Sequence, residues 1–124
     1  MKSYNLSFGV IRVLGKNRAE VIVNEGVDMG VLQVKEYLNF LSTHLELPFS
    51  VIVNRKYTYT YTYTFEAQKL IVNNDKIKNL AVIVSSSGGL LASETLLSLN
   101  EKSKWNTKFF RTRADAILWL DKNS

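Results

Sequence analysis

Hydrophobic and polar positions alternate over the first part of the chain, as is typical of strands. Apolar side chains recur across residues 4–14, which predict one strand with an irregularity at Gly9. Residues 15–18 carry turn chemistry, and residues 19–24 predict a second strand. We therefore expect an antiparallel hairpin at the start of the fold.

The pattern then changes to the spacing of an amphipathic helix across residues 29–45. Asp28 is expected to be the N-cap of this helix, and Pro48 follows its end. The apolar stripe consists of Val31, Val34, Leu38, Leu41 and Leu45. Residues 49–54 then predict a third strand, because they are almost all apolar or β-branched.

Strands and helices alternate in the rest of the chain. A short helix is expected at about residues 64–73, and the continuous apolar run of residues 80–84 predicts a central strand that is covered on both faces. A third helix carries Leu90, Leu91, Leu96, Leu97 and Leu99. The chain closes with a short strand at residues 108–111 and a helix at residues 114–120, which Thr112 is expected to cap.

This order of elements predicts the fold class. Strands that are separated by helices need crossover connections and become parallel neighbours in a sheet. We expect one α/β domain over residues 1–124, with a mixed sheet of about five strands and helices packed on it. The sheet would begin with the antiparallel hairpin and continue with parallel crossovers.

Composition narrows the class of protein further. The chain has no cysteine, which excludes disulfides, thiolate chemistry and cysteine-bearing zinc sites. No apolar run reaches the length of a membrane span, and the first residues carry no signal-peptide pattern, so we expect a cytoplasmic protein. The formal net charge of +5 favours an anionic partner, although a nucleic-acid interface is not expected without a denser basic face.

Five cations gather near the end of the chain with no acid between them. They are Lys102, Lys104, Lys108, Arg111 and Arg113. A solvated helix end followed by a strand explains this window, and an anion-binding patch is the alternative.

The first candidate site is a run in which tyrosine and threonine alternate strictly across residues 57–64. In an extended chain all four rings would share one face. The rings of Tyr57, Tyr59, Tyr61 and Tyr63 could line a groove for a ligand or peptide, pair with a second copy of the chain, or extend the sheet and pack on a helix. Arg55 and Lys56, just before the run, could protect its edge from pairing with other chains, or could attract an anion at the same end of the sheet.

The second candidate site follows the central strand. Ser85, Ser86, Ser87, Gly88 and Gly89 lie between that strand and the next expected helix. Two glycines permit close backbone approach, and helix N-terminal N–H groups attract anions. The segment predicts either a turn with a helix cap or a cradle for phosphate or carboxylate, but it matches no established phosphate-binding motif.

No catalytic set is evident in the sequence. His44 is the sole histidine and is expected at the exposed end of the first helix, where the helix dipole favours a cation. Glu20, Glu25 and Asp28 fall around the second strand and its exit, where we expect them to be solvated. We therefore predict no metal site, no cofactor and no general acid–base pair.

The order of elements resembles the SpoIIAA-like branch of the STAS family, the fold of anti-sigma-factor antagonists. The closing segment 109–120 is similar to the ending of that family, in which a short strand precedes a helix with Ala, an aliphatic pair and Trp-Leu. The resemblance implies a non-enzymatic module, of a kind found in small bacterial proteins, that binds a protein or a small ligand.

The regulatory members of that family carry a phosphorylatable Ser in an Asp-Ser-(Ser/Thr)-Gly motif between the third strand and the second helix. The matching stretch here, residues 54–64, holds no Asp, Ser or Gly. Thr62 and Thr64 offer hydroxyls near the expected helix start and are the candidate phosphoacceptors, but neither lies in the motif.

These observations lead to one functional expectation. The protein should be a non-enzymatic binding or regulatory module for a protein partner or a small apolar or anionic ligand. Its site should lie where the third and fourth strands end, at residues 55–64 and 85–89. The alternatives are a small enzyme that binds a phospholigand at residues 85–89, and a homodimer paired through the Tyr/Thr run.

Overall fold

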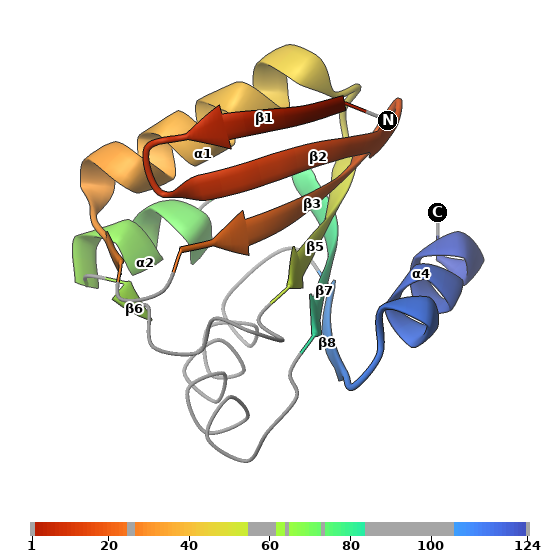
Figure 1. Ribbon diagram of the computed structural model, residues 1–124. Coiled ribbons are helices and arrows are strands. Elements are labelled where there is room, and N and C mark those ends of the chain that lie inside the picture. The colour runs from red at the N-terminus through yellow and green to blue at the C-terminus, as the bar shows by residue number, and fades with distance from the viewer. Residues whose placement is uncertain are drawn as a thin grey trace.

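Six strands form one mixed sheet in the described part of the chain (Figure 1). A computed structural model describes residues 2–24, 27–54, 62–63, 65–72, 74–83 and 106–123. The strands lie in the order β1 (Lys2–Leu6), β2 (Gly9–Gly15), β3 (Arg18–Val23), β5 (Phe49–Asn54), β7 (Ile77–Ile83) and β8 (Asn106–Phe110). The first three pair antiparallel, and all later neighbours pair parallel. The predicted α/β mixed sheet is confirmed, with six strands in place of about five.

The additional strand comes from a tight hairpin near the N-terminus. The prediction of one strand across residues 4–14 is wrong, because the chain reverses at Ser7–Phe8 and pairs Leu6 with Gly9. Phe8 in this turn is fully buried. Its apolar side chain continues the alternation of the flanking strands, and this continuity conceals the turn in the sequence.

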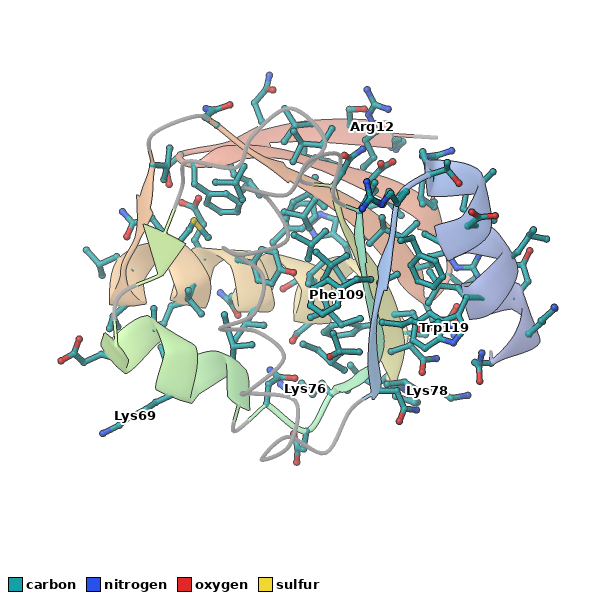
Figure 2. All side chains as sticks on the ribbon, turned by 90° about the horizontal axis from the view of Figure 1, so that it is seen from below. Arg12, Lys69, Lys76, Lys78, Phe109 and Trp119 are labelled. Atoms are coloured by element: carbon teal, nitrogen blue, oxygen red, sulfur yellow. The ribbon has the colours of Figure 1, made fainter. Side chains whose placement is uncertain are left out.

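Helices cover both faces of the sheet. α1 (Val31–His44) and α2 (Phe65–Val72) lie on one face, and α4 (Arg113–Lys122) lies on the other (Figure 1). At β8 the two faces are marked by Phe109, which packs with the α1 side, and Trp119 of α4, which lies on the opposite side of the strand (Figure 2).

The first helix begins later than the sequence predicts. Asp28 is not its N-cap, because Asp28–Met29 form the short strand β4. This strand pairs in parallel with β6 (Thr62–Tyr63) in a separate two-stranded sheet. Gly30 takes the cap position instead, and its N–H donates to Oε1 of Gln33 at 3.0 Å. The amide of Gln33 thus satisfies a backbone donor at the helix start.

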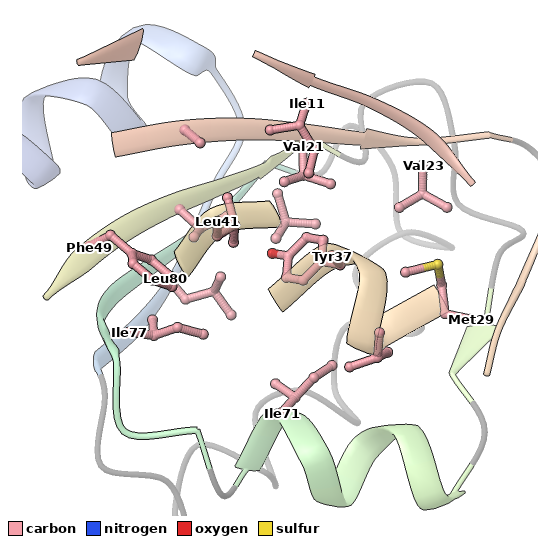
Figure 3. Close-up of a cluster of buried hydrophobic side chains, with 14 of the residues drawn as sticks. Ile11, Val21, Val23, Met29, Tyr37, Leu41, Phe49, Ile71, Ile77 and Leu80 are labelled. Carbon is pink, nitrogen blue, oxygen red and sulfur yellow. The ribbon is translucent and has the colours of Figure 1, made fainter. Parts of the chain in front are cut away.

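The larger hydrophobic core lies between the sheet and the α1–α2 layer (Figure 3). Its members include Phe8, Ile11, Val21, Val34, Tyr37, Leu41, Phe49, Val51, Ile71, Leu80 and Val82. A smaller core under α4 contains Ile52, Ala81, Ile83, Ala116 and Leu120. Strands β5 and β7 supply side chains to both cores, as expected of central strands.

Later elements follow the prediction closely where the structure describes them. β5 has the predicted bounds, and β7 begins at Ile77, earlier than expected. Thr112 caps α4, since its Oγ1 accepts a hydrogen bond from the Asp115 N–H at 3.2 Å. The helix expected around residues 90–99 lies outside the described residues.

Strands β2 and β3 approach each other closely at Gly9, and a substitution there can test this approach. A Cβ atom at this position would lie 2.0 Å from the carbonyl oxygen of Ile22, which is backbone and cannot turn aside. We expect Gly9→Ala to lower the free energy of unfolding by about 2 kcal/mol or more, measured by urea denaturation.

Gly15→Ala is the matched control, because a Cβ there meets nothing within 4 Å. It should leave stability unchanged or raise it by up to about 1 kcal/mol, since Ala restricts the unfolded chain. Equal losses from both substitutions would contradict the register of this hairpin.

Candidate binding site

Two neighbouring parallel strands end together at one edge of the sheet. β5 and β7 pair so that Asn54 lies opposite Ile83, the last residue of each strand. The chain therefore leaves both strands at the same edge, as the sequence analysis expected. We call this edge, defined by Asn54 and Ile83, the β5/β7 rim.

Most of the residues predicted to form the site lie outside the described residues. These are Arg55, Tyr57, Tyr59, Tyr61, Thr64, Ser85, Ser86, Ser87, Gly88 and Gly89. Their assignment to the site stays a prediction. Thr62 and Tyr63 are described as backbone, and they form the strand that pairs with Asp28 and Met29.

Beside the rim lies a buried carboxylate that the sequence analysis missed. Glu20 on β3 is 0% exposed, so the expectation that it is solvated is wrong. Its Oε1 accepts a hydrogen bond from Nε of Arg113 at 3.0 Å, and its Oε2 accepts one from Nδ2 of Asn54 at 3.0 Å. We call these three side chains the Glu20 network.

The Glu20 network joins the sheet to the start of α4. A carboxylate that leaves water is stable only when opposite charge and hydrogen bonds replace its hydration. Here Arg113 supplies the charge, and Asn54 at the end of β5 supplies a second donor. The Arg113 side chain nevertheless remains 42% exposed, while that of Glu20 is 1% exposed. The network thus holds an accessible cation close to the β5/β7 rim.

A second arginine lies next to the buried carboxylate. Arg12 on β2 is directly opposite Glu20 in the antiparallel register, so the two side chains project from the same face. Arg12 is exposed. Figure 2 shows it on the side of the sheet where α4 begins. Two arginines therefore flank one buried acid.

The far end of α4 is fixed by different contacts. Nη1 of Arg18, at the start of β3, binds Oδ1 of Asp121 at 2.8 Å. The buried side chain of Asn79 donates to the carbonyl oxygen of Asn123 at 3.2 Å. α4 therefore crosses the sheet with its first turn at the rim and its last turn at the opposite edge.

Surface grooves occur elsewhere on the described part of the molecule. One of about 470 Å³ lies between α1 and α2, with Lys35, Leu38 and Leu70 in its lining. Another of about 470 Å³ lies between β8 and α4, with Phe110 and Trp119 in its lining. These grooves do not include the residues of the Glu20 network.

His44 and Trp119 both pack against a neighbouring aromatic ring. His44 is exposed at the end of α1, as predicted, and its ring stacks on Phe40 with a centroid distance of 4.0 Å. Trp119 packs against Phe110 at the smaller core. Among the described residues, no group of three or more His, Cys, Asp or Glu side chains could hold a metal ion.

No known family profile matches the sequence, and no curated protein sequence matches it. One solved structure matches over 97% of this chain and 99% of its own length, with a TM-score of 0.62 and 17% identity. That structure is an uncharacterised protein of the DUF3478 family with a SpoIIAA-like fold, from Shewanella loihica PV-4.

The chain has a SpoIIAA-like fold. The resemblance inferred from the order of elements and the closing segment is therefore confirmed for the fold. Within the described residues, no helix is both long and apolar enough to cross a membrane.

The Glu20 network makes a prediction about stability. Arg113→Ala removes the charge partner of a fully buried carboxylate, so we expect a loss of about 3 kcal/mol in the free energy of unfolding at neutral pH. Urea denaturation followed by circular dichroism measures this loss.

Arg18→Ala is the control, because it breaks an ion pair in which Asp121 is 57% exposed. Its cost should be smaller than that of Arg113→Ala, since the Asp121 carboxylate keeps contact with water when its partner is removed, although the Arg18 side chain itself is 20% exposed. Similar costs for the two substitutions would show that Glu20 does not depend on Arg113.

Proposed function

We propose that this protein is a non-enzymatic cytoplasmic binding or regulatory module whose ligand or protein partner binds at the β5/β7 rim. The observation that carries this proposal is the register of β5 and β7, which brings the ends of the two strands together at Asn54 and Ile83. Ligands of α/β proteins commonly bind beyond the carboxyl ends of adjacent parallel strands.

Two further observations support the same location. The Glu20 network places an exposed cation beside the rim, and the chain carries an excess of positive charge. The segments that follow the two strands contain four tyrosines and a run of serines and glycines, which are residue types suited to contacts with a partner or an anion. The cysteine-free composition fits a reducing compartment.

One described contact bears on the homodimer alternative. The backbone of Thr62 and Tyr63 pairs with β4 of the same chain. One of the two hydrogen-bonding edges of this short strand is therefore already occupied. A strand shared between two copies would therefore have to use the other edge of these two residues.

The proposal predicts where small molecules bind. In a fragment screen followed by amide chemical shifts of the full chain, bound fragments should shift the amides of residues 52–64 and 81–90. Tyr59→Ala or Tyr61→Ala should weaken such fragments by about tenfold, the effect of losing roughly 1.4 kcal/mol of contact. The melting temperature should stay nearly unchanged.

Leu32→Ala provides the control, because Leu32 is 78% exposed on α1, on the opposite face of the sheet from α4. It should affect neither binding nor melting temperature. Fragments that shift only the α1–α2 groove around Lys35 and Leu70 would exclude the rim as the binding site. A large loss of stability from both tyrosine substitutions would show that these rings are core residues.

A further inference from the structure

We propose that Arg113 is an anion-recognition residue, and that the ligand or partner presents a phosphate or carboxylate group to it. This inference rests on the proposed function, because it assigns the chemistry of the group that binds beside the β5/β7 rim. The argument depends on which part of the guanidinium the protein uses for its own structure.

Arg113 binds Glu20 through Nε alone. In the described part of the chain, no hydrogen bond or ion pair joins its Nη1 or Nη2 to another residue. Its side chain is 42% exposed, so these nitrogens can reach solvent. A guanidinium presents pairs of parallel N–H groups that match the spacing of oxygens in a carboxylate or phosphate.

The second arginine bridge of α4 shows the contrast. Arg18 binds Asp121 through its terminal Nη1 at 2.8 Å, whereas Arg113 keeps its terminal nitrogens away from the contact with Glu20. Both bridges attach α4 to β3. A contact through a terminal nitrogen would therefore attach the helix equally well. Because Arg113 uses Nε instead, its terminal nitrogens remain available for a second anion.

Burial of Glu20 makes this geometry rigid. Its two oxygens are held by Arg113 and Asn54, so the carboxylate fixes the Nε edge of the guanidinium. An arginine that is already oriented loses less side-chain entropy when it binds an anion. Replacing a buried ion pair with apolar residues is often neutral or stabilising, so stability alone is a weak reason for a carboxylate here.

Charge around Arg113 also favours an anion. Arg12 lies opposite Glu20 in the sheet, and Arg111 is exposed just before α4. Among the described residues close to Arg113 in the sheet or along α4, the acids are Glu20, which is bound as described, and the exposed Asp115 in the first turn of the helix. Among these described side chains, three arginines stand against two carboxylates, and the N-terminal end of the helix dipole adds partial positive charge.

The test follows the arginine side-chain Nε–Hε signals of the full chain by NMR during titration with inorganic phosphate, and with acetate in a separate arm. We expect the Arg113 signal to shift and saturate at millimolar anion, while the Arg18 signal stays in place. Saturation with phosphate alone would assign a phosphate ligand, and saturation with acetate alone would assign a carboxylate ligand. Equal, non-saturating shifts of both arginines would overturn the proposal, because they would report only general screening.

Arg113→Lys is the matched variant, because it retains the positive charge and loses the fork of parallel donors. It should weaken anion binding by about tenfold, and Arg18→Lys should leave binding unchanged. If Arg113→Lys does not fold, the titration of the unmodified chain still decides the question.

The inference and the proposed function can fail separately. Fragments that bind the rim equally well in the Arg113→Lys variant would leave the proposed function intact and refute the role of Arg113. Saturable anion binding at Arg113, with no fragment shifting the rim amides, would support the inference and refute the broader site.

Discussion

The buried carboxylate of Glu20 is the constraint on which the arrangement of the rim depends. It lies on β3, and its two oxygens bind the end of β5 and the first residue of α4. These partners are separated by long stretches of sequence, so the network fixes elements that local structure could not align. An unpaired carboxylate at this depth would be costly, and both partners must therefore stay in place while the protein is folded.

Hydrophobic packing supplies the framework within which this network forms. β5 and β7 contribute side chains to the cores on both faces of the sheet, so their register is fixed from two sides. Ala116 and Leu120 of α4 pack in one cluster with Ile52 of β5 and Ala81 of β7, which holds the helix against these two central strands. The result is a rim with rigid strands below it and an oriented arginine beside it. In the proposed function, this arrangement recognises a ligand through the position of its groups.

Much of the fold could be predicted from the sequence, because periodicity reports which face of an element is buried. The bounds of β5, the cap at Thr112 and the SpoIIAA-like order of elements were all accessible in this way. The turn at Ser7–Phe8 was not, because a buried aromatic residue in a turn preserves the strand pattern. Glu20 was also missed, because an acid in a strand is normally solvated. The sequence did predict helices on both faces of the sheet, and this prediction could have indicated that a helix covers the side chain of Glu20.

A double-mutant cycle between Glu20 and Arg113 tests this account most directly. Glu20→Gln, Arg113→Met and the double variant would be compared with the unmodified chain by urea denaturation at neutral pH. The account predicts a coupling free energy of about 2 kcal/mol, as expected of a charged hydrogen bond to a buried group. Additive effects, with coupling below about 0.5 kcal/mol, would contradict it, because they would show that the two side chains do not act together.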